Sequence, residues 1–236
     1  MRKFPFKESR QGNRLLERLP EEDLQRLAPN LEPVHIPKAF LIYEAGESIR
    51  YVYFPTTAAI SLLSLTNDGG IIEVGVVGHE GMAGISGILG VNRIPYRARA
   101  QVSGEALRME ASILREEFNR GGMLQGLLLR YVHALLSQIS QSAVCNHFHN
   151  SEQRLCRWLL VMQDRVRSDV LSLTHELIAH MLGASRTNVT AIAQKLQEKG
   201  LIRYRWGQIT IVDRRGLKAA SCECYQVLSR EFVDLL

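Results

Sequence analysis

Hydrophobic and polar positions divide the chain into stretches with different periods. Between Glu32 and Met109, short runs rich in β-branched and aromatic residues alternate with turns containing Gly, Asn and Asp. These runs are VHIPKAFLIYEAGE, YVYFP, AISLLSL, IIEVGVV and RARAQV. Their spacing predicts a small antiparallel β-barrel or sandwich. A short amphipathic helical segment, Leu15–Leu27, precedes them and is broken at Pro20.

From Gly122 onward the hydrophobic period becomes helical, with two stripes at spacings of three and four. One stripe is apolar throughout: Leu129, Val132, Leu136, Ile139 and Ala143. The other turns polar in its second half: Leu124, Leu128, Tyr131, Leu135, Gln138, Ser142, Cys145 and His149. A helix of roughly 27 residues, ~40 Å long, can pack one face on its own barrel and the other on a partner helix. The apolar stripe is the predicted dimer interface; the alternative is a helix buried inside one domain.

Residues 171–213 have the order helix, turn, helix, hairpin. Thr174 is suited to cap a first helix, and Gly183 to end it in the left-handed conformation. Ser185 caps a second helix that stops at Gly200. Two β-type runs joined at Trp206-Gly207 then predict a small wing.

Small and hydrogen-bonding side chains on the exposed face of the second helix are what entry into the DNA major groove requires. We expect Arg186, at the helix tip, to read a base edge, and Arg203 and Arg205 of the wing to neutralise phosphates. The predicted DNA-binding residues are Thr174, Ser185, Arg186, Thr187, Asn188, Thr190, Ala191, Arg203 and Arg205. The alternative is a winged-helix scaffold used only for protein contacts.

Charge and composition agree with a nucleic-acid-binding module at the C-terminal end. Residues 151–236 hold 13 Lys and Arg against 9 Asp and Glu, whereas residues 1–150 hold 16 against 15. We therefore expect a sensory barrel at 1–121, a dimerisation helix at 122–150 and a winged helix-turn-helix domain at 151–236. Apolar runs are too short for a membrane span, and the basic N-terminus lacks the apolar core of a signal peptide. The expected location is the cytoplasm.

The four cysteines are Cys145, Cys156, Cys222 and Cys224. They form no CxxC pair, and a chain of this size needs no disulfide, so we expect reduced thiols. A metal site in the segment CNHFH, which begins at Cys145 and is followed by Cys156, is weighed against ordinary helix residues. On a helix, His147 would point away from Cys145 and His149. Ordinary helix residues are favoured, since zinc ligands more often have CxxC or HxxxH spacing; the expectation is no metal and no cofactor.

Six glycines recur at every third position from Gly75 to Gly90. This segment contains neither GxGxxG nor GK[ST], so it supports neither dinucleotide nor P-loop binding. Two interpretations stay open: tight corners of a barrel, or a loop whose backbone N–H groups approach an anionic ligand.

The segment LTHELIAHMLGASRTNVTAIAQKLQEKGLI, followed by a short wing, resembles the DNA-binding domain of the Crp/Fnr regulators. SEQRLCRWLL looks like the helix leading into that domain, and LLERLPEEDLQRL, IYEAGE, YVYFP and NDGGIIEVGVVGHEGMAG look like the cyclic-nucleotide-type barrel. The resemblance covers nearly the whole chain and is most specific at 183–201. It implies an α+β protein with a jelly-roll barrel, a long dimerisation helix and a C-terminal winged helix-turn-helix.

The resemblance also implies a homodimer that reads a palindromic site on double-stranded DNA, acts with RNA polymerase on transcription and senses a small molecule. Cyclic-nucleotide binders of the family carry Gly-Glu for the ribose and Arg-Ser for the phosphate. The nearest equivalents here are Gly81-Met82, or Met82-Ala83, and Ile94-Pro95, so the effector is not expected to be cyclic AMP. Nearby arginines leave an anion site open: Arg93, Arg97 and Arg99.

Other functions fit the sequence less well. The oxygen-sensing branch of the family holds its iron–sulfur cluster with cysteines near the N-terminus, but this chain has no cysteine before Cys145, and no haem ligand stands out. A metal-dependent cupin enzyme needs a cluster of histidines, but the predicted barrel has only His35 and His79. A nucleotide-binding module that regulates a partner protein without touching DNA is the remaining alternative, against which the helix-turn-helix argues. We expect no enzyme activity.

Overall fold

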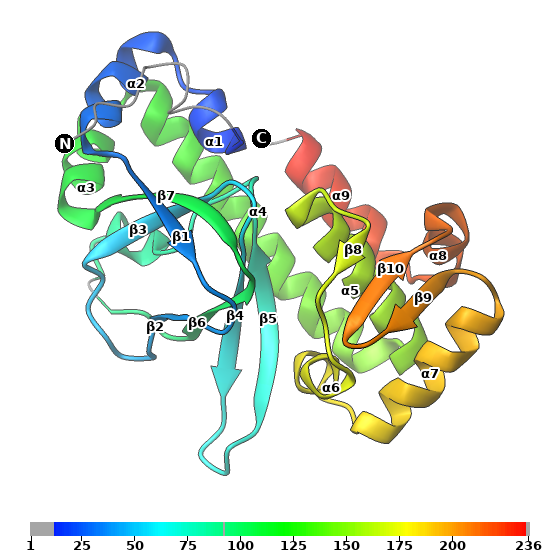
Figure 1. Cartoon of the computed structure of the whole chain (residues 1–236). Coiled ribbons are helices and arrows are strands. Elements are labelled where there is room, and N and C mark those ends of the chain that lie inside the picture. Colours follow the sequence, from blue (N-terminus) through cyan, green and yellow to red (C-terminus); the bar gives the residue numbers. More distant parts are fainter. Residues whose placement is uncertain (1–11, 92, 235–236) are drawn as a thin grey trace.

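The computed structural model describes residues 12–91 and 93–234 of the 236-residue chain. The basic N-terminal stretch considered above as a signal peptide lies mostly outside the described residues. Figure 1 shows a β-sheet lobe and a helical lobe, with the long helix α4 running behind both. The chain begins with two short helices, α1 (Arg14–Glu17) and α2 (Glu21–Leu27), separated at Pro20 as the sequence predicts, and the 3₁₀ turn η1 (Ala28–Asn30).

Seven antiparallel strands form the first lobe, here called the jelly roll. They are β1 (Glu32–Ile36), β2 (Leu41–Tyr43), β3 (Tyr51–Pro55), β4 (Ala59–Leu65), β5 (Ile71–Val77), β6 (Arg97–Val102) and β7 (Gly104–Glu110). A short 3₁₀ turn, η2 (Ile85–Gly87), lies between β5 and β6. One sheet has the order β1-β7-β3 and the other β2-β6-β4-β5. The predicted antiparallel architecture is confirmed, although the described strands form two sheets rather than one closed barrel.

Helix α3 (Ala111–Asn119) follows the jelly roll, and α4 (Gly122–Phe148) follows after a break at Gly121-Gly122. Both glycines have positive φ, 82° and 78°, which a residue with a Cβ rarely adopts and which lets the chain reverse between the helices. Helix α4 buries the mixed stripe from Leu124 to Cys145 against its own chain. The predicted long helix is therefore confirmed, and this face fixes it to the jelly roll.

The second lobe follows α4 directly. It contains α5 (Ser151–Val166), β8 (Val170–Leu171), α6 (His175–Leu182), α7 (Arg186–Glu198), β9 (Ile202–Arg205), β10 (Gln208–Ile211), α8 (Arg214–Ala220) and α9 (Cys224–Asp234). A capping box at Asn150 and Gln153 starts α5 immediately after α4 ends. Strands β8, β10 and β9 form a small antiparallel sheet. Helices α8 and α9, absent from the sequence prediction, return the chain to α5 and α4.

The hydrophobic core of the helical lobe extends into the jelly roll. Ala59 and Leu63 of β4 and Val76 of β5 belong to the same buried cluster as Trp158 of α5 and Ile178 of α6. Lys38 of the jelly roll also donates a hydrogen bond to the carbonyl of Ser172 at 2.6 Å. The two lobes therefore pack directly on each other. Among the described helices, none combines the length and the apolar character needed to cross a membrane.

Candidate DNA-binding surface and junction pocket

The helix-turn-helix is built from local caps. Thr174 accepts a hydrogen bond from the Leu177 N–H at 3.2 Å and starts α6. Gly183, at φ 58°, ends it in the left-handed conformation. Ser185 then accepts from the Asn188 N–H at 3.2 Å and starts α7. These are the caps that the sequence predicts, and they place α7 one short turn after α6.

Helix α7 buries one face and exposes the other. Its buried residues are Val189, Ile192, Ala193 and Leu196. The exposed face carries most of the predicted contact residues: Ser185, Arg186, Thr187, Asn188 and Ala191. Thr174 is also exposed, at the start of α6. The exposed side chains at the start of α7 are therefore short, except for that of Arg186. Short side chains allow the helix to approach the edge of a groove closely.

Thr190 differs from the predicted contacts on the exposed face of α7 because it is half-buried and its hydroxyl reaches a side chain of α6. It is half-buried, donates to the Arg186 carbonyl at 2.9 Å, and lies 2.9 Å from His175 Nδ1. The His175 ring in turn stacks on Tyr204 of the wing, with centroids 4.0 Å apart. Thr190 thus connects α6, α7 and the wing. Desolvation, followed by the nearby Arg186 charge, lowers the pKa of His175 and favours its neutral form.

A two-residue turn joins the strands of the wing. Arg205 pairs with Gln208, and the residues between them, Trp206 and Gly207, have φ values of 51° and 75°. Two positive φ values are typical of a type I′ turn, which matches the twist of a hairpin. Arg203 and Arg205 are exposed, and Trp206 is 100% exposed at the tip. The sequence located this turn but did not single out its tryptophan as a contact.

Two lysines of α7 brace the domain internally. Glu152 of α5 pairs with Lys195 at 2.5 Å and with Lys199 at 2.9 Å. Hydrogen bonds from the two ammonium groups lower the pKa of Glu152. The pairs hold Lys195 and the C-cap Lys199 against α5, and Asn188 also donates to Ser151 Oγ of α5 at 3.2 Å. Arg186, at the start of α7, stays exposed and can face a ligand.

Buried side chains without charge occupy the positions where the family resemblance locates the contacts to a cyclic nucleotide. Met82, Ile94 and Tyr131 are each 1% exposed. The Tyr131 hydroxyl donates to the Met82 carbonyl at 2.8 Å, and a Cβ at Gly81 would come within 2.4 Å of the Tyr131 ring. A carboxylate for a ribose and a cation for a phosphate are missing at these positions, and Tyr131 of α4 packs directly against Gly81 and Met82.

The three arginines nearest to this region are not gathered into an anion site. Arg97 pairs with Glu44 at 2.8 Å, and Arg99 donates to the Ala39 carbonyl at 3.1 Å. Arg93 borders a largely apolar surface cavity of about 480 Å³, which is also lined by Ile94 and Pro95, the pair equivalent to the phosphate-binding residues. The structure thus brings no pair of these guanidinium groups together on one ligand position.

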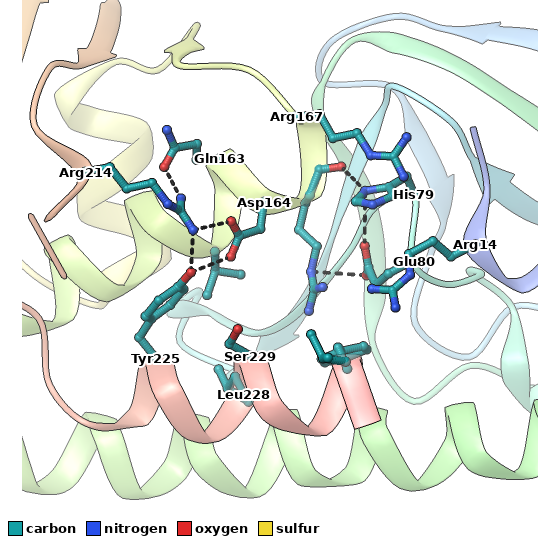
Figure 2. A pocket seen from close by; sticks show the side chains of 14 residues that line it. Arg14, His79, Glu80, Gln163, Asp164, Arg167, Arg214, Tyr225, Leu228 and Ser229 are labelled. Carbon is teal, nitrogen blue, oxygen red and sulfur yellow. Dashed lines mark hydrogen bonds and ion pairs between the residues drawn. The ribbon is translucent and has the colours of Figure 1, made fainter. Parts of the chain in front are cut away.

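A more polar cavity of about 380 Å³ lies at the junction of the two lobes. Figure 2 shows His79 and Glu80 on one side and Asp164, Arg214 and Tyr225 on the other, above helix α9. We call this cavity the junction pocket. Its cationic side chains are Arg14, Arg165, Arg167 and Arg214, against the carboxylates of Glu80 and Asp164.

Ion pairs connect the jelly roll to the helical lobe in this pocket. Glu80, from the glycine-rich loop, lies 3.1 Å from Arg165 Nε at the end of α5, and both side chains are buried. His79 Nδ1 lies 3.0 Å from the Arg165 carbonyl, and burial lowers its pKa. The sequence treated His79 only as a poor cupin ligand and passed over Glu80, because pairing with a residue 85 positions away leaves no local pattern.

The predicted dimer stripe lies on the outer side of α4. Leu129 and Leu136 are 48% and 58% exposed, and Ala143 is exposed too. Val132 and Ile139 are half-buried against the core of their own chain. Met123, Val144 and Phe148 add further exposed apolar side chains to the same helix. The internal packing of α4 therefore uses the mixed stripe and leaves much of the apolar stripe in solvent.

Comparison with known proteins identifies the helical lobe. A family model of the Crp-like helix-turn-helix domain matches residues 153–220. Among curated proteins, the global nitrogen regulator of Nostoc sp. (strain PCC 7120) is 24% identical over 180 residues, which cover 72% of this chain and 80% of that protein.

Solved structures match the fold of both lobes. FixK2 from Bradyrhizobium japonicum has a TM-score of 0.67 at 16% identity, over 81% of this chain and 98% of that one. A CRP-family transcriptional regulator from Thermus thermophilus has a TM-score of 0.66 at 19% identity, over 80% of this chain and 96% of that one. The c-di-GMP responsive global regulator of Xanthomonas campestris has a TM-score of 0.62 at 16% identity, over 82% of this chain and 100% of that one. Residues 153–220 thus belong to the Crp-like helix-turn-helix family, and the chain as a whole has the fold of solved CRP-family transcriptional regulators.

Proposed function

We propose that the protein is a homodimer that binds a palindromic DNA site through α7 and controls transcription in response to a ligand other than cyclic AMP. The observation that carries this proposal is the exposed N-terminal half of α7, with Arg186 at its tip and the rest of the helix braced by Glu152. In this proposal Arg186 reads a base edge, and Arg203 and Arg205 neutralise phosphates. The remaining predicted contacts position the helix: Thr174, Ser185, Thr187, Asn188, Thr190 and Ala191.

Dimerisation through α4 is supported by the exposed apolar stripe. In a two-fold symmetric dimer, the stripe on α4 of one chain would pack against the same stripe on α4 of the other chain. Burying the leucine side chains between the two helices is favourable. Two copies would then present two α7 helices to successive major grooves, which a palindromic site mirrors. On this basis we assign residues 1–121, 122–150 and 151–236 to sensing, dimerisation and DNA binding.

The effector has a candidate site in the junction pocket. Met82 is buried and uncharged, whereas the junction pocket lies between the jelly roll and α5 and carries more arginines than carboxylates. A ligand bound there would contact both lobes, so it could change how α7 is held. We propose an anionic small molecule as its occupant, RNA polymerase as the partner on promoter DNA and the cytoplasm as the location.

The test is selection of bound duplexes from a random pool, with and without anionic metabolites. Recovery of an inverted repeat by the wild-type protein, and its loss in Arg186→Ala with Thr187→Ala, supports the proposal. The matched control is Glu198→Gln, also exposed on α7 but at its C-terminal end. Recovery of no enriched sequence at low salt, where non-specific contacts are strongest, contradicts it.

A further inference from the structure

Four metal-ligating side chains converge where α4 ends and α9 begins. Cys145 lies in the last turn of α4 and His149 is the C-cap of that helix, whereas Cys222 and Cys224 come from the connection between α8 and the start of α9. One donor atom from each lies within 4.8 Å of all the others. All three cysteines are buried, and the His149 side chain is only 11% exposed. The cluster thus joins two segments that are more than 70 residues apart.

The distances within the cluster fit one tetrahedral ion. Zinc bonds of about 2.3 Å to sulfur and 2.0–2.1 Å to nitrogen place two sulfurs roughly 3.8 Å apart, and a sulfur and a nitrogen roughly 3.6 Å apart, in a tetrahedron. The Cys145 and Cys222 sulfurs are 3.6 Å apart, and Cys224 Sγ lies 3.5 Å from His149 Nδ1. Donor atoms this close enclose a single ion and leave no room for a polynuclear cluster.

A second set of polar groups already orients these ligands. Glu223 Oε2 lies 3.2 Å from His149 Nε2, so the ring can donate from Nε2 to the carboxylate and keep Nδ1 free to bind. Gln141 of α4 donates an N–H to Cys224 Sγ at 3.0 Å, as it would to a thiolate. A carboxylate behind the histidine ligand is the arrangement that fixes its tautomer in zinc sites. Ordinary core packing of three thiols would require neither contact.

We propose that Cys145, His149, Cys222 and Cys224 bind one structural zinc ion. Three thiolates and one imidazole are a recognised closed zinc set, with no position left for water or substrate. The ion would fasten the start of α9 to the end of α4, and so hold the helical lobe on the proposed dimerisation helix. The sequence analysis expected no metal, because the segment at Cys145 lacks CxxC or HxxxH spacing; Cys222 and Cys224 join it only in the folded chain.

The competing structure is a Cys145–Cys222 disulfide. It would require the two sulfurs to approach from 3.6 Å to about 2.05 Å and would leave Cys224 and His149 without a common role. Zinc uses all four side chains, and it is compatible with a reducing compartment, where disulfides rarely persist. Measuring the zinc content of the protein separates the two.

The full-length protein, carrying no histidine tag, is purified with reductant, and its zinc is measured by mass spectrometry. We expect about one zinc per chain for the wild type and less than about 0.1 for Cys222→Ala with Cys224→Ala. The matched control is Cys156→Ala, since Cys156 is equally buried but lies in a different core cluster. Cobalt added to the metal-free wild type should give the intense absorption of a tetrahedral thiolate complex.

Metal removal provides a readout on the intact chain, in case the double variant folds poorly. A strong chelator should lower the melting temperature of the wild type and of Cys156→Ala by more than about 5 °C, and zinc should restore it. A wild type that holds no zinc and gives no tetrahedral cobalt spectrum overturns the proposal. So does a Cys145–Cys222 disulfide found by peptide mapping of protein from the cytoplasm, or zinc retained in the double variant.

Discussion

Trp158 of α5 donates its indole N–H to the carboxylate of Glu73 on β5 at 2.7 Å, across the boundary between the two lobes. The other oxygen of Glu73 accepts from the Ser61 hydroxyl at 2.5 Å. Both Trp158 and Glu73 are buried, so the carboxylate has little access to water. Burial raises the pKa of Glu73 to about 7, although the two hydrogen bonds oppose the shift. A group that titrates near neutral pH therefore lies between the jelly roll and the helical lobe.

This pKa predicts how stability depends on pH. The carboxyl holds its proton more tightly in the folded protein than in the unfolded chain, where its pKa is near 4.5. Its contribution is therefore complete below about pH 4.5 and is lost as the pH rises through about 7. The shift is equivalent to at most about 3 kcal/mol. Urea unfolding of the wild type and Glu73→Gln across pH 5–8 should show that this decline is absent from the variant.

The comparison isolates Glu73 because other titrations occur in both proteins. Burial lowers the pKa of His79, because the ring must stay neutral in the folded protein. Its contribution to stability therefore increases as the pH rises, opposite to that of Glu73. The exposed Glu116→Gln is the matched control and should keep the wild-type pH profile. Parallel pH profiles for Glu73→Gln and the wild type would contradict the prediction.

Much of the fold follows from local patterns. Strands β3 to β6 have the bounds of the predicted runs, and α4, α6 and α7 have the predicted faces and caps. The spacing of apolar residues and the N-cap residues involve only a few neighbouring positions, so both can be recognised in the sequence. The β7 strand was not singled out because its run, GEALRME, contains three charged residues and shows little β-branching. Helices α8 and α9 were not predicted, although Asp213 caps α8 by accepting a hydrogen bond from the Gly216 N–H at 2.9 Å.

The site could be predicted only where its parts are neighbours in sequence. Arg186 and the wing arginines are recognisable from a helix tip and a hairpin. The Glu80–Arg165 ion pair and the Cys145–Cys222 contact join residues 85 and 77 positions apart, so they exist only after the lobes have packed. The contact between Tyr131 and Met82 has the same origin. Composition and spacing contain no information on which distant side chains will meet.

Lysine in place of Leu136 should prevent dimerisation. Leu136 is 58% exposed in the single chain, so the substitution should leave the monomer folded. At a helix–helix seam the lysine would bury an unpaired charge, at a cost of several kcal/mol. Light scattering at micromolar concentration should give a dimer for the wild type and a monomer for Leu136→Lys. Leu41→Lys, at a similarly exposed position on β2, is the control and should stay dimeric; a monomeric wild type would refute the assignment.

Cyclic AMP should bind weakly or not at all. Met82 and Ile94 stand where a carboxylate and a cation would be needed, and the Tyr131 hydroxyl binds the Met82 carbonyl. Each missing charge-assisted bond costs ~1.5–3 kcal/mol, so two losses move a micromolar site toward millimolar. Calorimetry should detect no binding at about 100 μM ligand, a concentration well below the dissociation constant of such a weak site. A dissociation constant below about 10 μM would show that the nucleotide binds in a rearranged pocket.

Arg186 and Arg203 should have separable effects on DNA binding. A guanidinium at the tip of α7 can make a bidentate contact with guanine, worth ~1–3 kcal/mol of discrimination. Arg186→Ala should therefore flatten the preference at one base pair of each half-site. Arg203→Ala should weaken all duplexes similarly and reduce the salt slope by ~1 for each phosphate that it leaves without a cation. Anisotropy titrations on matched and singly mismatched duplexes measure both; equal weakening of every duplex by Arg186→Ala would show that this arginine binds a phosphate.

Trp206 should stabilise the DNA complex at some cost to the free protein. It is fully exposed at the wing tip and has φ 51°, a conformation that costs a bulky residue roughly 1–2 kcal/mol. Asn before Gly is the preferred pair for a type I′ turn, so Trp206→Asn should raise the free energy of unfolding by about 1 kcal/mol. The same variant should bind every duplex more weakly, because it removes the indole from a wing that flanks α7. Trp158, buried in α5, provides the internal fluorescence reference: DNA should change the emission of the wild type but not that of Trp206→Asn. If the variant is more stable and binds DNA as tightly as the wild type, the indole makes no contact with DNA.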